Sequence, residues 1–290
     1  MRVPVVYSQV MVADSGHEVS PSASKPGLVA AALKAQEYPV DIVAPEPVSV
    51  EDLLRVHDPR FVKAVLEGRE DNGFGNRSPE VAASLPYTTG SLVTACKLAL
   101  GPLRPMVVAS LSSGFHHARY AKAADFCTFN GLMVAAAYLL ANSRVKRVAI
   151  LDADYHYGDG TDEILDETGL RANVFHLSFG QEFKRPDQAE AFFARLDALE
   201  QDLRRFEPQV ILYQAGADAH IDDPLGGFLT TEQMGTRDEK VFSLGKALGI
   251  PIVFNLAGGY QRDADGGISK VVRLHLNTFS AALRVHGPGT

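Results

Sequence analysis

The sequence predicts one α/β domain, in which helices cover both faces of a mostly parallel sheet. Two observations predict this fold class: short runs rich in Val, Ile, Leu and Phe recur along the 290 residues, and helical patterns lie between them. Such an alternation is typical of a parallel sheet with helices on both faces. No stretch of Pro, Ser or Gly is long enough for a linker, so we expect a single domain over residues 1–290.

Seven apolar runs are expected to form strands that are buried on both faces, because each reads as a continuous hydrophobic segment. In chain order they are Val5–Tyr7, Ile42–Val43, Met106–Val108, Val148–Leu151, Val174–Leu177, Val210–Tyr213 and Ile252–Phe254.

Two helices are predicted most clearly by the spacing of their apolar residues. The first has spacings of 4, 3, 4 and 3 residues, which place one apolar stripe along a helix; its stripe is Phe192, Leu196, Leu199, Leu203 and Phe206. It should end before Pro208, which opens the next strand. The second is expected to begin at Thr230, where Gln233 completes a capping box. Its buried side would carry Met234, Val241, Leu244 and Leu248.

Composition and charge exclude several classes of protein. With 46% hydrophobic and 22% charged residues, the chain is typical of globular proteins and not of disordered or fibrous ones. Lys and Arg number 28 against 35 Asp and Glu, a net charge of −7 without a basic stripe, so we expect no nucleic-acid partner.

The lengths of the apolar runs and the number of cysteines indicate where in the cell the protein is located. The apolar runs fall short of the roughly 20 residues that span a bilayer, and the start of the chain lacks a signal-peptide pattern. We therefore expect a cytoplasmic protein with no membrane partner. Cys96 and Cys127 are the only cysteines, which excludes a disulfide framework and a four-cysteine zinc site.

Polar residues gather directly after four of the predicted strands. In open parallel sheets the ligand site lies beyond the carboxyl ends of the strands. One such segment would most often be a solvated turn, but four together predict a site. The segments are Ser112–His117, Asp152–Gly160, Gln214–Asp218 and Gly258–Tyr260.

The segment after the fourth strand predicts a metal site. In an extended strand end, Asp152, Asp154 and His156 would share one face, since side chains two apart point the same way. Such a cluster near an apolar core is costly unless a cation or protons hold it, and a divalent metal would satisfy this. Asp218 can supply a third ligand. Carboxylate and imidazole ligands suit zinc, and also Fe²⁺, Mn²⁺ or Co²⁺, and three protein ligands leave a position open for water and substrate.

The remaining polar residues predict acid–base chemistry. His116 and His117 are candidates for positioned proton carriers, which hydrolysis of an amide requires. Asp152 and Asp159 could each orient one imidazole and raise its basicity. Tyr260, after two glycines, could donate its hydroxyl to a carbonyl oxygen on which negative charge develops.

Together these segments resemble the histone deacetylase and acetylpolyamine amidohydrolase superfamily, which has the arginase–deacetylase fold, and in particular its bacterial-type deacetylase-like proteins. The resemblance runs from about residue 44 to residue 260. Its motifs are Val56–Pro59, Gly114–Ala118, Asp125–Asn130, Asp152–Gly160, Ala215–Asp218 with Asp223–Pro224, and Gly258–Tyr260.

The resemblance implies a role for each of these residues. Zinc would be bound by Asp154, His156 and Asp218. The proton carriers would be His116 and His117, backed by Asp152 and Asp159, and Tyr260 would polarise the acyl oxygen. The substrate would lie in a narrow tunnel whose wall includes Phe126 and Gly114. A structural K⁺ or Na⁺ near Asp152, Asp154 and His156 is a further implication of the family.

The chain departs from the family pattern at several positions. Tyr157 stands where a second histidine is usual, and Ser20–Pro26 replaces a common rim segment. An acidic rim residue that binds the substrate backbone is expected near residues 71–76, and we predict Asp71. Leu225 occupies a place where a carboxylate would favour cationic polyamines.

These observations support a zinc-dependent amidohydrolase that removes acetyl or other acyl groups from acyl-lysine peptides or proteins. Within the enzyme class, the alternative is an amidohydrolase for acetylpolyamines or other small acetylated amines. A two-manganese guanidine hydrolase would need more metal carboxylates than this set supplies. From a different class comes a module that binds acylated lysine without cleaving it. An oligomer is compatible with the sequence.

Overall fold

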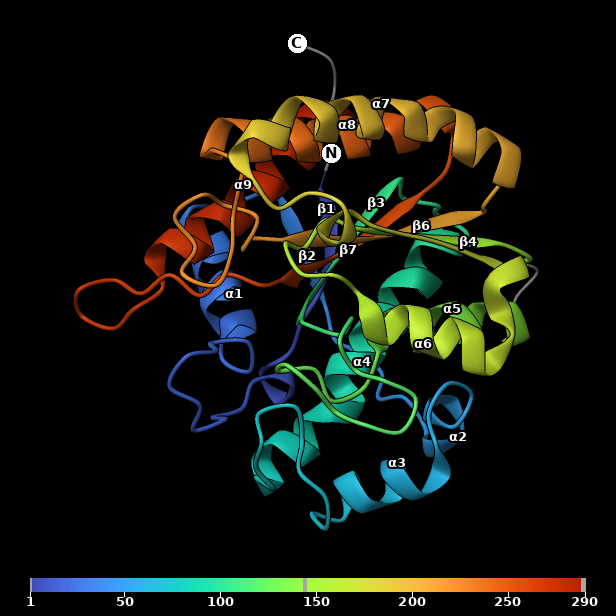
Figure 1. Cartoon of the computed structure of the whole chain (residues 1–290), viewed down its shortest axis with the longest axis vertical. Helices are drawn as coiled ribbons and strands as arrows, with labels where there is room; N and C mark the ends of the chain where they lie inside the picture. Colours follow the sequence, from blue (N-terminus) through green and yellow to red (C-terminus); the bar gives the residue numbers. More distant parts are fainter. Residues whose placement is uncertain (1, 143–144, 288–290) are drawn as a thin grey trace.

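The computed structural model describes residues 2–142 and 145–287, and in these residues seven strands form one parallel sheet (Figure 1). Its strand order is β2–β1–β3–β7–β6–β4–β5, and every neighbouring pair is parallel. The strands are β1 (Val3–Val6), β2 (Val40–Val43), β3 (Val107–Ser113), β4 (Val148–Asp152), β5 (Val174–Ser178), β6 (Val210–Gly216) and β7 (Ile252–Ala257). The predicted fold class is confirmed.

Helices form a layer on each face of this sheet (Figure 1). One layer contains α1 (Lys25–Ala35), α7 (Ala189–Phe206), α8 (Thr231–Leu248) and α9 (Ser269–His286). The opposite layer contains α4 (Pro79–Leu100), α5 (Gly131–Asn142) and α6 (Asp159–Thr168), with α2 (Val50–Leu53) and α3 (Pro59–Leu66) packed beyond them. Short 3-10 turns lie at Gln9–Met11, Leu170–Ala172, Phe179–Gln181 and Pro186–Gln188.

The central strands send alternate side chains into the two layers. In β4, Ala149 and Leu151 join the apolar cluster under α7 and α8, whereas Val148 and Ile150 join the cluster under α5 and α6. Because both faces are covered, each position in such a strand has to be apolar. This is why the central strands read as continuous hydrophobic runs.

The prediction that all seven strands are buried on both faces is wrong for the two edge strands. In β2, Asp41 and Ile42 are exposed, and the three central residues of β5 are only partly buried. Both strands end the strand order, so neither has a neighbour beyond it among residues 2–142 and 145–287. Short, partly polar edge strands are how parallel sheets usually terminate.

The two predicted helices are α7 and α8. In α7 the stripe is buried except for Phe206 at its end, and in α8 Leu248 is likewise only partly buried at the last turn. The capping box forms as predicted: the Thr230 hydroxyl accepts from the Gln233 amide, and the Gln233 side chain accepts from the Thr230 amide at 2.9 Å. Local sequence therefore fixes the start of α8.

Asp58 in the motif Val56–Pro59 caps helix α3. Its side chain accepts hydrogen bonds from the backbone amides of Arg60 and Phe61, and Pro59 occupies the first helical position. A carboxylate at this position satisfies amides that the helix leaves without partners. The Asp and Pro of this motif thus begin a helix.

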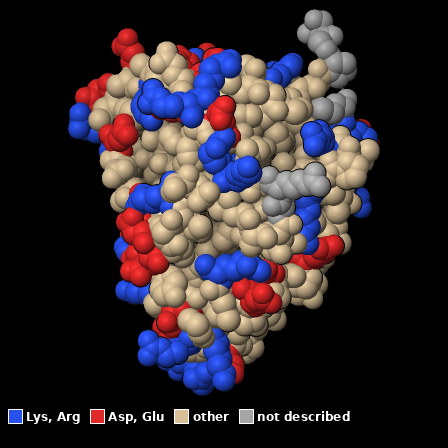
Figure 2. Space-filling view, turned by 90° about the vertical axis from the view of Figure 1, so that its right-hand side faces the viewer, with Lys and Arg blue, Asp and Glu red and all other residues tan. Residues whose placement is uncertain are grey.

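On the face that Figure 2 shows, Lys and Arg side chains are interspersed with Asp and Glu and separated by neutral residues. Among the helices that the structure describes, none combines the length and the apolar character needed to cross a membrane.

Candidate active site

The polar segments meet where β3, β7, β6 and β4 end side by side in the sheet. Asp152 is the last residue of β4, and Asp218 follows the end of β6 by two residues. Parallel strands bring their carboxyl ends to one edge, so loops far apart in the sequence converge there.

Asp154, His156 and Asp218 form a cluster in which one oxygen or nitrogen atom of each lies within 4.8 Å of the others. His156 Nδ1 is 2.9 Å from Asp218 Oδ2 and 3.4 Å from Asp154 Oδ1. On its other side, His156 Nε2 donates to the Leu225 carbonyl at 3.2 Å. Since that carbonyl can only accept, Nε2 carries a proton, and Nδ1 faces the two carboxylates.

The electrostatics of this cluster call for a cation. Burial opposes a positive ring at His156, but the carboxylates of Asp154 and Asp218 outweigh it and raise its pKa to about 10. Burial and the neighbouring Asp154 raise the pKa of Asp218 to about 7. Two buried carboxylates and one imidazole are a donor set that suits a divalent metal, which would neutralise both charges.

The prediction that Asp152, Asp154 and His156 share one face of an extended strand holds for the common direction of Asp154 and His156, but it is wrong for Asp152 and for the extended conformation. Strand β4 ends at Asp152, and the chain then turns: the Asp154 amide donates to Asp152 Oδ1, and the His156 amide donates to Asp154 Oδ1. Asp152 consequently faces His116, while Asp154 and His156 face Asp218. Side-chain acceptors, and not the two-residue period of a strand, arrange these residues.

Two glycines allow the loops to approach the cluster closely. A Cβ at Gly216 would lie 2.4 Å from Asp154 Cα, and one at Gly258 would lie 2.2 Å from Asp218 Cγ. Gly258 also has a φ of +49°, a conformation that other residues rarely adopt. A side chain at either position would displace a residue of the cluster.

His116 and His117 lie next to this cluster, each paired with a carboxylate. His116 Nδ1 is 2.7 Å from Asp152 Oδ2, and His117 Nδ1 is 2.8 Å from Asp159 Oδ1. The two ring centroids are 4.1 Å apart. His116 Nε2 lies 3.7 Å from Asp154 Oδ1, so this ring presents Nε2 to the cluster.

The two imidazoles differ in their affinity for a proton. Burial opposes a charge on His116, but Asp152 and Asp154 outweigh it and raise its pKa to about 9. For His117, burial and the adjacent His116 lower the pKa, against the opposing effect of Asp159. Their surroundings thus shift the pKa values of the two rings in opposite directions.

Tyr260 and Phe126 form a wall beside the cluster. The Tyr260 amide donates to Asp223 Oδ2 at 2.8 Å, and its ring centroid lies 5.7 Å from that of Phe126. Burial, with Asp218 nearby, raises the pKa of Tyr260 well above its usual value, so the hydroxyl stays a donor. Gly114 has a φ of +99° and packs against Cys127 and the Phe126 carbonyl.

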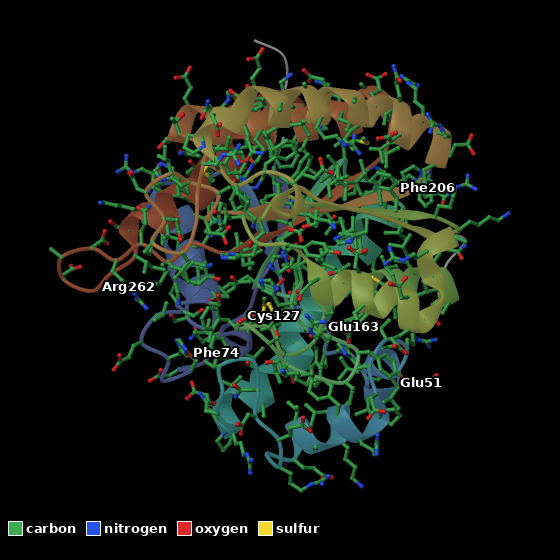
Figure 3. The ribbon with its side chains drawn as sticks, viewed as in Figure 1. Glu51, Phe74, Cys127, Glu163, Phe206 and Arg262 are labelled. Carbon is green, nitrogen blue, oxygen red and sulfur yellow. The ribbon has the colours of Figure 1, made fainter. Side chains whose placement is uncertain are left out.

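Sequence reasoning missed two rings of this wall, His17 and Phe74. The His17 ring centroid lies 4.8 Å from Phe126, and that of Phe74 lies 6.2 Å from Phe126 (Figure 3 labels Phe74 and Cys127 on the two segments). The segments are joined because the Phe126 amide donates to the Gly73 carbonyl. Each ring stands alone in an irregular loop, so no pattern in the sequence signals it.

The two predicted rim residues lie in different surroundings. Asp71 is exposed and paired with Arg77 at 2.7 Å, in the loop that also carries Phe74. Leu225 is 41% exposed and places its carbonyl on His156. Both are accessible, and Leu225 lies directly beside the cluster.

Lys25 is a further buried group that sequence reasoning missed. Its Nζ donates to Ser113 Oγ at 3.0 Å and to the Gly258 carbonyl. Burial lowers its pKa to about 8, although the carboxylates of Asp218 and Asp154 oppose this shift. Lys25 thus adds a positive charge behind the cluster.

Tyr157, the departure from the family pattern, turns away from the cluster. Its hydroxyl donates to Asp162 Oδ2 at 2.6 Å, on helix α6. Asp162 also faces His176 Nδ1 at 3.2 Å and Arg171 at 2.9 Å. Burial and Asp162 raise the pKa of Tyr157 to about 12. This tyrosine belongs to a polar group on the outer side of the loop.

Comparison with known proteins gives consistent results. The sequence matches the histone deacetylase domain over residues 21–192 and 181–278. It is 27% identical over 252 residues to histone deacetylase 2 of Arabidopsis thaliana, covering 77% of this chain and 64% of the plant protein. It is 26% identical over 273 residues to a probable deacetylase of Methanothermobacter thermautotrophicus, covering 81% and 78%.

A solved structure has the same fold. The acetylpolyamine aminohydrolase from Burkholderia pseudomallei superimposes with a TM-score of 0.73 at 21% sequence identity, covering 98% of this chain and 99% of that one. The curated relatives differ in length, and this chain spans slightly less than two thirds of the Arabidopsis protein.

Proposed function

The chain belongs to the histone deacetylase family, and from this premise we propose that it is a metal-dependent amidohydrolase that removes acetyl or other acyl groups from acyl-lysine-type amides. Residues 1–290 would act as one catalytic domain. One observation carries the proposal: the Asp154–His156–Asp218 cluster lies directly beside two histidines that are each backed by a carboxylate.

The three ligand candidates fit a divalent metal, and we propose zinc. Asp154, His156 and Asp218 would hold it, with the Leu225 carbonyl fixing the ring of His156 so that Nδ1 faces inward. When bound, the ion would act as a Lewis acid that activates a water molecule and polarises the acyl oxygen. Fe²⁺, Mn²⁺ and Co²⁺ accept the same donors.

The histidine pair would move the protons that amide hydrolysis requires. One ring would take a proton from the attacking water, and a protonated ring would then deliver one to the departing amine. Asp152 and Asp159 fix both rings through Nδ1, which leaves the Nε2 atoms to exchange protons with the reactants. The difference in proton affinity between His116 and His117 supports such a division of roles.

Tyr260 would stabilise the negative charge that develops on the acyl oxygen. Its hydroxyl remains protonated and lies in a largely buried site, where a hydrogen bond to an oxyanion is strongest. Phe126 packs against the same ring, and together with His17 and Phe74 it would form the tunnel for the methylene chain of the substrate. Aromatic faces hold such a chain without needing a charge on it.

The alternative substrate is an acetylated polyamine or another small acetylated amine. A polyamine carries additional ammonium groups, which a carboxylate at the rim would attract. Leu225 presents an aliphatic side chain beside the cluster, so this position offers no such attraction. We therefore favour acyl-lysine.

One experiment tests the function and the substrate class together. The purified protein would be analysed for bound metal, stripped with a chelator, reloaded with Zn²⁺, and assayed on acetyl-lysine peptides and on acetylated polyamines. We expect about one metal ion per chain, loss of activity on chelation, recovery on reloading, and faster turnover of the peptides. Faster turnover of the polyamines would favour the alternative. Metal binding without hydrolysis of either substrate would favour the binding module.

A further inference from the structure

Helix α8 places a charged residue, Arg237, in the interior directly behind the Asp154–His156–Asp218 cluster. Its side chain is 1% exposed, and Nη1 donates to two backbone carbonyls, that of Ala153 at 3.1 Å and that of Gly216 at 2.8 Å. Ala153 directly precedes Asp154, and Gly216 precedes Asp218 by two residues. One nitrogen atom thus contacts both loops that carry the carboxylates of the cluster.

The carbonyls of Ala153 and Gly216 lie just beyond the last paired residues of β4 and near the end of β6, where hydrogen bonds between these two strands end. The paired register of β4 and β6 ends at Asp152 opposite Gln214, and the Ala153 amide still donates to the Gln214 carbonyl. Beyond that point the chains touch, because a Cβ at Gly216 would lie 2.4 Å from Asp154 Cα. A planar guanidinium that donates to both carbonyls fixes the distance between the two loops, as an ammonium on a flexible stem does not.

A network of buried groups holds Arg237 in this position. Arg237 Nε donates to Asp238 Oδ1 at 2.8 Å. The same carboxylate accepts from the hydroxyls of Tyr213, on β6, and Thr278, on α9. The guanidinium is therefore tied to the sheet and to two helices, which makes it a rigid support.

Burial of the Arg237–Asp238 ion pair lowers the stability that this part of the interior could provide. Both members of the Arg237–Asp238 ion pair are at most 2% exposed, and Arg237 Nη2 has no hydrogen-bond partner in the described part of the chain. A buried ion pair usually adds little net stability compared with apolar side chains of similar size, and an unsatisfied buried donor costs more. The structure therefore indicates a task for Arg237 other than stabilising the fold.

We infer that Arg237 is a positioning residue that sets the separation of Asp154 and Asp218 through the carbonyls of Ala153 and Gly216. The inference rests on the proposed function, because it assigns these carboxylates to a metal. It predicts that a change at Arg237 alters the affinity and the coordination geometry of the metal, although Arg237 does not contact the ion.

The test compares Arg237→Met and Arg237→Lys with a matched control, Thr278→Val, each as the full chain. The control removes one hydrogen bond to Asp238 and leaves both contacts of Arg237 with the carbonyls. Zn²⁺ affinity would be measured by competition with a chromophoric chelator, geometry by the visible absorption of the Co²⁺-loaded protein, and folding by circular dichroism.

We expect Arg237→Met to weaken Zn²⁺ binding by about 10- to 100-fold, the effect usual for residues that support metal ligands, and to change the Co²⁺ spectrum. Arg237→Lys keeps the positive charge but not the planar guanidinium. Its Zn²⁺ affinity should therefore lie between those of Arg237→Met and the unaltered protein. Thr278→Val should bind Zn²⁺ within about twofold of the unaltered protein, as residues outside the supporting contacts do.

Three outcomes would overturn the inference. The first is a folded Arg237→Met protein whose Zn²⁺ affinity and Co²⁺ spectrum match those of the unaltered protein. The second is an equal loss in Thr278→Val, which would indicate a general effect of the buried network. The third is that neither Arg237 variant folds while Thr278→Val does, which would assign Arg237 to the fold. Tight Zn²⁺ binding without hydrolysis would instead contradict the proposed function and leave this inference in place.

Discussion

His116 and His57 are both buried imidazoles, and they face opposite kinds of partner. At the carboxyl ends of the strands, His116 Nδ1 faces the carboxylate of Asp152, and its pKa rises to about 9 despite burial. Between α3 and α5, His57 Nδ1 donates to the Arg119 carbonyl at 2.9 Å, and Nε2 accepts from the Asn130 amide at 2.9 Å. Burial there lowers its pKa to about 4.

This difference shows that the partner, more than burial, decides whether a buried imidazole carries charge. Backbone partners use both nitrogens of His57 in one neutral form, so His57 joins the 119–120 segment to the start of α5. The same segment contains Arg119, which pairs with Asp159, the partner of His117. His57 therefore supports the loop that carries the histidine pair. We expect substitutions in the Asp154–His156–Asp218 cluster to change activity, and a substitution at His57 to change stability.

The largest expected effect is at the cluster, from Asp218→Asn. Loss of a ligand should abolish stoichiometric metal binding and lower turnover by about a thousandfold or more, because a metal contributes several kcal/mol to such a reaction. Removing one of two adjacent buried carboxylates should leave the stability of the chelator-treated protein unchanged or higher. Metal analysis, acyl-lysine turnover and urea denaturation measure the three quantities.

Asparagine suits this comparison because it keeps an oxygen that can accept from the Tyr155 amide, as Asp218 Oδ1 does. A lower unfolding free energy for Asp218→Asn, or full metal content, would contradict this prediction. In that case the carboxylate of Asp218 would stabilise the fold, or would not be needed to bind the metal.

The next effect is at Tyr260→Phe, which removes only a hydroxyl. The backbone amide of residue 260 still donates to Asp223, so the loop should keep its position. We expect turnover to fall by about 10²- to 10³-fold, the usual loss for one donor to an oxyanion, with metal content and stability retained. Steady-state kinetics with metal analysis on the same sample would measure this. Turnover within twofold of the unaltered protein would exclude a role for the hydroxyl.

The sequence predicts some parts of the fold and of the site better than others. The strands and the polar segments at their ends were predictable, because continuous apolar runs and strand-end residues are local signals. The motif pattern likewise predicts that Asp152 and Asp159 back the histidines, and both contacts are present. The grouping of Asp154, His156 and Asp218 was likewise predicted. The turn of the chain between Asp152 and His156 was not predictable, because side-chain acceptors replace the strand period there.

Other parts of the site depend on contacts between residues far apart in the sequence. Arg237 lies on a helix whose pattern predicts only a buried side, and Lys25 reaches a carbonyl 233 residues away. The rings of His17 and Phe74 come from loops without periodicity. Such residues carry no local pattern, so only the folded chain shows them beside the site.

A smaller effect, on stability alone, is expected at His57. In the unfolded chain this imidazole takes up a proton near pH 6.5, and in the folded chain only near pH 4. Between these values the unfolded state binds more protons, so the folded state loses stability as the pH falls from about 6.5 to about 4. A pKa lowered from 6.5 to about 4 corresponds to a loss of about 3 kcal/mol.

Urea denaturation of the unaltered protein and of His57→Gln at pH 7.5 and pH 4.5 measures this contribution. Other groups titrate equally in both proteins, so the difference between the two pH dependences isolates His57. We expect a flatter dependence in His57→Gln and nearly unchanged turnover at pH 7.5. Parallel pH dependences would mean that His57 is protonated in the folded protein, and the contrast with His116 would disappear.

The smallest expected effect is at Tyr157→Phe, on the border between the two regions. Tyr157 adjoins His156 in the sequence, but its hydroxyl points to Asp162 on α6. Asp162 keeps Arg171 and His176 as partners when that hydroxyl is removed. The loss in unfolding free energy should therefore be about 1 kcal/mol, as for one partly buried hydrogen bond, with turnover and metal affinity changed by less than about twofold. A tenfold fall in turnover at constant stability would instead assign Tyr157 a role in the reaction.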